Sequence, residues 1–122
     1  MSVTLPLSGQ VQSPVSTVLT TTNQTDIFTT PAGPASQKII AVHFANEHTS
    51  AVEITLEWND GSSDYTLFIK SIPTKDSVTF ESAILLSSIS ATQKLKVTAD
   101  TANVITATVV FVSDLGAQGR VS

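Results

Sequence analysis

Cysteine is absent from this sequence, which excludes disulfide frameworks, thiolate metal sites and thiol nucleophiles. Charge is also scarce, because 13% of the residues are Asp, Glu, Lys or Arg, against about 25% in ordinary domains. Arg120 is the single arginine, the five lysines form no cluster, and the net charge is −4. Proteins that bind nucleic acid present clustered basic residues, so we expect no nucleic-acid partner.

Long apolar runs are missing too. No stretch approaches the ~18 consecutive apolar residues of a membrane-spanning helix, so we expect no membrane partner. Residues 1–14 lack the basic start and the apolar centre of a secretory signal. The sequence therefore predicts a protein that is made and assembled in a cytoplasm.

Hydroxyl side chains provide the polar surface that charges provide elsewhere. The chain has 16 Ser and 18 Thr among its 122 residues. Ser and Thr compete with the helix backbone for hydrogen bonds, so this composition favours strands and turns over helices. The length fits one domain of ~100 to 150 residues, which can bury a core without a disulfide or a structural metal.

Alternation of apolar and polar residues predicts strands along most of the chain. Residues 51–58 alternate cleanly, with an apolar side ending at Trp58 that we expect to face the core. Asp60 and Gly61 follow and predict a hairpin turn. The return strand, residues 64–71, carries apolar residues on both of its faces.

Two other segments, residues 38–46 and 104–113, are also apolar on both faces, which predicts central strands. We expect their second face to be covered by the other sheet or by a neighbouring subunit. Within the first of these strands, Ile40, Val42 and Phe44 are expected to share one face.

The fold class expected from these patterns is all-β. Seven or eight strands, separated by turn residues, predict an antiparallel β-sandwich or jelly roll. We expect an extended N-terminal arm at residues 1–15, the sandwich domain at residues 16–113 and a C-terminal tail at residues 114–122.

Few residues of the sequence are candidates for a binding or catalytic site. Trp58, Asp60 and Tyr65 surround one hairpin and are candidates for contacting a sugar or a partner, although the stripe that Trp58 ends favours a core position for it. His43 lies within a predicted strand without a second metal-ligating residue two positions away, so a structural or interface role is expected for it. No phosphate loop, nucleophile elbow or zinc motif is present, and we expect no enzyme activity, no cofactor and no metal.

A diffuse resemblance to a known group covers about residues 16–113. It is carried by the following segments: residues 26–33, residues 38–46, residues 52–58 with the turn at Asp60 and the return at Tyr65, Ile72 with Pro73, and the pair 94–99 and 104–112. Together they resemble the small all-β virion structural proteins of tailed bacteriophages, which serve as head decoration, neck and tail components. The sequence departs from that pattern after Pro73 and before Leu95, in two turns.

The resemblance implies assembly without catalysis. It implies a capsid decoration or cement protein, located in the virion, which binds the major capsid protein or other virion proteins as a symmetric homo-oligomer, a trimer. A neck or tail component is the alternative within the same class. A carbohydrate- or receptor-binding module, using the hairpin around Trp58, is the alternative from a different class.

Overall fold

The structure is a computed structural model, and it describes residues 9–30, 36–87 and 91–114. Those residues contain ten strands and no helix. The strands are β1 (Gly9–Val11), β2 (Val15–Val18), β3 (Thr25–Thr29), β4 (Ser36–Asn46), β5 (Val52–Asn59), β6 (Asp64–Ile72), β7 (Ser77–Phe80), β8 (Ile84–Ser87), β9 (Lys94–Ala99) and β10 (Ile105–Asp114).

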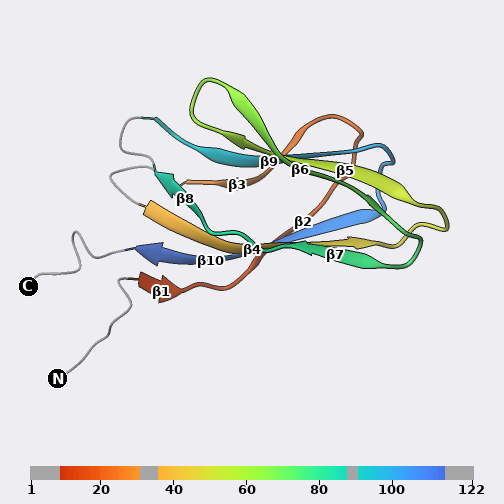
Figure 1. Cartoon of the computed structure of the whole chain (residues 1–122), viewed down its shortest axis with the longest axis horizontal. Coiled ribbons are helices and arrows are strands. Elements are labelled where there is room, and N and C mark those ends of the chain that lie inside the picture. The colour runs from red at the N-terminus through yellow and green to blue at the C-terminus, as the bar shows by residue number, and fades with distance from the viewer. Residues whose placement is uncertain (1–8, 31–35, 88–90, 115–122) are drawn as a thin grey trace, which may run out of the picture.

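These strands form two antiparallel sheets that pack face to face (Figure 1). In the six-stranded sheet, β10 and β4 lie at the centre, β1 and β2 share one edge of β10, and β7 and β8 share one edge of β4. The four-stranded sheet has the order β3-β9-β5-β6. The expected antiparallel sandwich is therefore confirmed, and the ten strands occupy eight positions because two pairs of short strands each share an edge.

The pairing follows the pattern of a jelly roll. The innermost pair is β5 with β6, and around it β4 pairs with β7 and β8, β3 pairs with β9, and β2 pairs with β10. The chain thus resembles one long hairpin whose two arms wrap alternately into the two sheets. This arrangement places the β5–β6 turn at the tip of the hairpin.

The core lies between the sheets and consists of aliphatic side chains with a few aromatic rings. Val52, Ile54 and Leu56 are fully buried, as the alternation of residues 51–58 predicts. Phe44 stacks on Phe68 across the sandwich, with ring centroids 6.4 Å apart. Burial of this kind is the main favourable contribution to folding.

Strand β4 departs from the predicted alternation. Ile39 is fully buried and Ile40 is 42% exposed, which is the reverse of the expectation that Ile40 shares a face with Val42 and Phe44. The reason is a bulge, since Ala41 pairs with Val110 and Ile39 pairs with Phe111, so that Ile40 has no partner across the ladder. An extra residue in one strand shifts the side-chain alternation by one position.

A second bulge accounts for two of the three adjacent apolar residues of β6, and the third, Ile69, is 58% exposed on the outer face. Leu56 pairs with Phe68 and Glu57 pairs with Thr66, which leaves Leu67 between the two pairs. Leu67 and Phe68 consequently both pack against the core although they are adjacent in sequence.

The segment expected as an N-terminal arm is partly an edge strand. Its residues Gly9–Val11 form β1 and pair with β10 at Val112 to Asp114. The six-stranded sheet therefore begins at β1, within the expected arm, and it ends at Asp114, the last residue of β10. The rest of the expected arm and almost all of the expected tail, residues 1–8 and 115–122, lie outside the described residues.

Candidate functional site

The hairpin between β5 and β6 carries three of the four residues singled out from the sequence. Its turn is held by the Asp60 carboxylate, which accepts hydrogen bonds from the backbone N–H groups of Ser62 at 2.9 Å and Ser63 at 2.8 Å. The Asn59 side-chain oxygen accepts a further bond from the Gly61 N–H at 2.8 Å. The turn is therefore closed by its own side chains, which is the usual role of Asp and Asn in such loops.

Replacing Gly61 by alanine is expected to lower the free energy of unfolding by about 1 to 3 kcal/mol. Gly61 has a φ of +108°, which L-residues rarely adopt, and a Cβ there would lie 2.5 Å from the Cβ of Ala91. Urea denaturation measures the loss. Ala91→Gly in the same chain should restore the part caused by the clash, and Ser62→Ala should leave stability almost unchanged. An unchanged stability of Gly61→Ala would contradict the close packing of the turn on Ala91.

Trp58 and Tyr65 lie side by side at the base of this hairpin. They are paired across β5 and β6, and their ring centroids are 5.6 Å apart at an interplanar angle of 33°. Trp58 is half-buried and packs against the core, whereas Tyr65 is 49% exposed. The indole Nε1 of Trp58 is buried and has no hydrogen-bond partner among the described residues.

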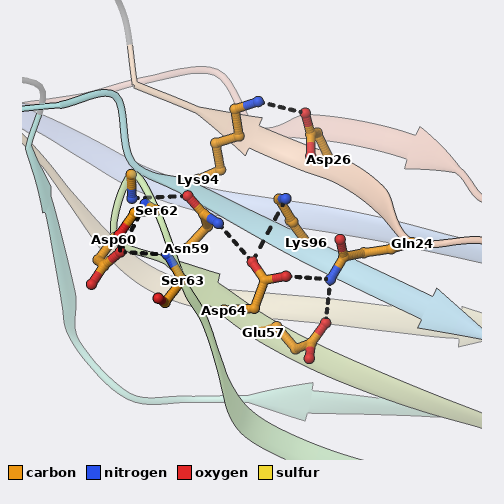
Figure 2. Close-up of polar contacts among 11 residues, drawn as sticks. Gln24, Asp26, Glu57, Asn59, Asp60, Ser62, Ser63, Asp64, Lys94 and Lys96 are labelled. Carbon is orange, nitrogen blue, oxygen red and sulfur yellow. Dashed lines mark hydrogen bonds and ion pairs between the residues drawn. The ribbon is translucent and has the colours of Figure 1, made fainter.

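A network of polar side chains covers the outer face of the four-stranded sheet next to the hairpin (Figure 2). The Gln24 amide nitrogen donates to both Glu57 and Asp64. Asp64 also accepts a bond of 2.7 Å from Asn59 and lies 3.6 Å from the Lys96 ammonium group. Lys94 and Asp26 form an ion pair of 3.1 Å on the same face. Each charged group of this network has a partner, so the network is satisfied in water as it stands.

Two carboxylates of this region have a lowered pKa. For Asp60 the main cause is the hydrogen bond from the backbone N–H of Ser63, followed by that of Ser62. For Asp64 the main causes are the hydrogen bonds from the Asn59 and Gln24 side chains, with a smaller contribution from the charge of Lys96. Both groups are thus stabilised in their charged form.

We expect these two carboxylates to make the protein less stable in acid. Their pKa in the unfolded chain is about 3.9, so the unfolded state binds more protons than the folded state just below that pH. The stabilisation is complete above about pH 5 and is lost as the pH falls through the lower folded pKa values. The temperature at which half of the protein is unfolded would be measured from pH 6 to pH 2. It should fall less for the double variant, Asp60→Asn combined with Asp64→Asn, than for the unmodified chain. Parallel curves for the two proteins would contradict this origin of the acid sensitivity.

The outer face of the six-stranded sheet is different in character. Its outward side chains are mostly hydroxyl-bearing, such as Ser and Thr, or apolar, such as Ala and Val. We call this surface the charge-poor face. It comprises Ser16, Val18, Lys38, Ile40, Ala41, His43, Ala45, Ser77, Thr79, Leu85, Thr106, Thr108, Val110 and Val112. Lys38 is the single Lys, Arg, Asp or Glu among these side chains, and Asp114 follows at the end of β10, where it pairs with Ser36.

Several large apolar side chains on the charge-poor face are exposed. Leu85 is 64% exposed, Val18 is 50% exposed and Ile40 is 42% exposed. Two pairs of polar side chains on this face bond to each other: the hydroxyls of Ser16 and Thr108 are 2.9 Å apart, and the His43 Nδ1 is 2.9 Å from the Thr79 hydroxyl. Ile69 and Tyr65 on β6 are exposed too, at 58% and 49%, so the feature that sets the six-stranded sheet apart is exposed apolar side chains together with a shortage of charge. Such a combination is typical of an interaction surface.

The four residues singled out from the sequence thus belong to two places. Trp58, Asp60 and Tyr65 meet at the β5–β6 hairpin, as their spacing predicts. His43 lies on the outer face of the other sheet, away from that hairpin, and bonds to Thr79. The sequence signalled the charge-poor face only through strands that are apolar on both sides, because the bulge that exposes Ile40 follows from pairing with β10.

The part of the chain that the structure describes lacks two other kinds of feature. No group of three or more His, Asp or Glu side chains in residues 9–30, 36–87 and 91–114 is arranged to hold a metal ion. No helix long and apolar enough to cross a bilayer occurs in the same ranges.

Comparison with known proteins gives no relative for this chain. Neither the protein-family scan, nor the search of curated proteins, nor the search of solved structures finds a match. The resemblance to tailed-phage virion proteins therefore stays a prediction, and the functional argument depends on the two surfaces described above.

Proposed function

We propose that this protein is a structural subunit of a bacteriophage virion, most specifically a decoration or cement protein that binds the major capsid protein of the head. The observation that carries the proposal is the charge-poor face, where Val18, Ile40 and Leu85 are exposed on a sheet with almost no charge. Leaving such a face in water is costly, and burying it against other subunits recovers that cost.

The architecture agrees with this role by analogy. Jelly rolls are common among viral capsid proteins, although the same architecture also occurs in lectins and cupins. The two outer faces of this sandwich suit a subunit that is embedded on one side. One face carries paired charges such as Lys94 with Asp26 and remains satisfied in solvent, while the opposite face is uncharged over most of its area.

The test is assembly with the capsid. The full chain would be co-expressed with the major capsid protein encoded in the same genome, and the shells would be sedimented through a density gradient. We expect the chain to travel with the shells in a fixed ratio and to raise the temperature at which they break. Shells that sediment without it would contradict a decoration role. Cryo-electron microscopy of whole particles separates this proposal from its alternative, because density at the neck or tail would indicate a connector or tail component.

A carbohydrate-binding module is the second candidate, favoured by the Trp58 and Tyr65 ring pair beside the exposed hairpin. Tyr65 presents nearly half of its surface, and aromatic faces are frequent platforms for sugars. Two observations weigh against it: Trp58 packs against the core, and the Asp60 carboxylate is already engaged by Ser62 and Ser63.

Fluorescence provides the experiment for this second candidate, because Trp58 is the single tryptophan of the sequence. The protein would be titrated with glucose, galactose and N-acetylglucosamine while the tryptophan emission is recorded. A saturable change that is lost in Tyr65→Ala would establish a sugar site. A flat titration for all three sugars, which the structural-subunit proposal predicts, would remove support for it.

A further inference from the structure

We propose that the charge-poor face binds the same face of a second copy of this chain, so that two sandwiches stack through their six-stranded sheets around a two-fold axis. The inference rests on the proposal that the chain is a subunit of an assembly. It assigns the charge-poor face to a second copy, so that the dimer would meet the capsid protein through the other surfaces of the two sandwiches. It goes further because the partner is identical and the contact is symmetric.

The first argument is the distribution of charge. The chain has a net charge of −4, and the opposite outer face carries Glu53, Glu57 and Asp64 among its outward side chains. Two copies that approach through that face would bring carboxylates together and would have to dehydrate a network of ion pairs. The charge-poor face is where two acidic copies can meet with the least repulsion.

The second argument is that two pairs of polar side chains on this face already bond to each other. The hydroxyls of Ser16 and Thr108 bond to each other, and His43 bonds to Thr79. These four side chains would each keep a hydrogen bond when the face leaves water, which lowers the penalty for burying polar groups. Lys38 pairs with Val112 and Leu85 at one end of the sheet, so it would stay at the rim of the contact.

The third argument is area. Four strand positions ~4.8 Å apart, with strands of about ten residues at ~3.3 Å per residue, span roughly 600 Å². Two such faces in contact would bury roughly 1,200 Å² in total, which is at the lower end of the range for specific, stable interfaces. The face is therefore large enough for a dimer, and sheet faces stack about 10 Å apart when the side chains between them interdigitate.

The small and β-branched side chains at the centre of the face suit that stacking. Thr108 and Val110 on β10 lie beside His43 and Ala41 on β4, in the middle of the sheet. In a contact between two identical faces, the two-fold axis passes through the centre of the contact. Position 108 of one copy is consequently expected to lie close to position 108 of the other.

The test introduces charge at that position. The unmodified full chain should have a mass near twice 12.8 kDa in sedimentation velocity at micromolar concentration. Thr108→Glu should weaken the dimer by at least about 100-fold, because like charges would meet in a dehydrated contact. The matched control is Thr98→Glu, since Thr98 is also half-buried and outward-facing on a central strand, but of the other sheet. The control should remain a dimer although it adds the same charge.

A mixing experiment identifies the partner as a second copy. Thr108→Glu and Thr108→Lys chains should each be monomeric alone and should form a mixed dimer when combined, which native mass spectrometry resolves by mass. Circular dichroism of both variants should match the unmodified chain, and a variant that unfolds would be replaced by Val110→Glu on the same strand.

Other results would overturn the inference. A monomeric unmodified chain would do so, and so would equal dissociation by Thr98→Glu. A trimer, the order implied by the phage resemblance, would also overturn it, because a two-fold contact between identical faces closes with two copies. Capsid binding is scored separately: a dimer that does not sediment with shells overturns the proposed function alone, and a monomer that does sediment with them overturns the pairing alone.

Discussion

Replacing Asn46 by alanine is expected to lower the free energy of unfolding by about 3 to 5 kcal/mol, since it leaves several buried backbone groups without partners. Asn46 is the last residue of β4 and is 2% exposed. Its side-chain nitrogen donates to the carbonyl oxygens of Ser50 at 3.0 Å, Ile72 at 3.0 Å and Pro73 at 3.1 Å. Its side-chain oxygen accepts from the His48 N–H at 2.8 Å. One amide thereby joins the β4–β5 connection to the end of β6.

Chemical denaturation of the purified chain measures this effect, and two further variants define its cause. Asn46→Asp keeps an oxygen for the His48 N–H but replaces the donor with a carboxylate facing carbonyl oxygens, so it should be at least as harmful as alanine. Asn23→Ala, in the exposed connection between β2 and β3, should change stability by less than about 0.5 kcal/mol. Equal losses at positions 46 and 23 would show that the buried amide network contributes little.

Truncation of Trp58 to alanine is expected to cost about 3 kcal/mol, the lower part of the range for large aromatic residues, because the side chain is half-buried. Trp58 pairs with the fully buried Leu95 on β9 and packs against the core from the end of β5. Its removal leaves space beside Leu95 and takes away the ring on which Tyr65 lies.

Trp58→Phe separates packing from hydrogen bonding. Phenylalanine keeps an aromatic ring, and it removes an indole N–H that is buried without a partner among the described residues. The loss in unfolding free energy should therefore be less than about 1.5 kcal/mol. Thermal denaturation of both variants provides the comparison. If the phenylalanine variant were as unstable as the alanine variant, the indole N–H would have to make an important bond in the folded protein.

Much of the sandwich followed from local patterns. The alternation in residues 51–58 assigned Val52, Ile54 and Leu56 to the core, and the Asp60 and Gly61 pair located the hairpin turn. These predictions succeeded because a strand with one face in the core must alternate, and because a tight turn needs a residue that tolerates positive φ. Ser and Thr content excluded a helical protein for a similarly local reason.

Other features had no local signal. The bulge in β4 arises where the ladder with β10 skips Ile40, so the burial of Ile39 could not be derived from β4 alone. Asn46 is a polar residue at a strand end in the sequence, and only the approach of Ile72 and Pro73 makes it a buried link. The sequence made His43 a candidate for partner contacts, as it did Trp58, Asp60 and Tyr65 of the hairpin. In the structure His43 and the hairpin belong to different sheets.

Hydroxyl content and alternation are properties of short segments, and they were enough to predict antiparallel strands around a cysteine-free aliphatic core. Tertiary structure decided which strands became neighbours and which outward side chains came to share a surface. Val18, Ile40 and Leu85 are distant in sequence, and they share one face only because β2, β4 and β8 join the same sheet. Pairing between strands that are far apart in the sequence brings such residues together, and this pairing cannot be predicted from any short segment.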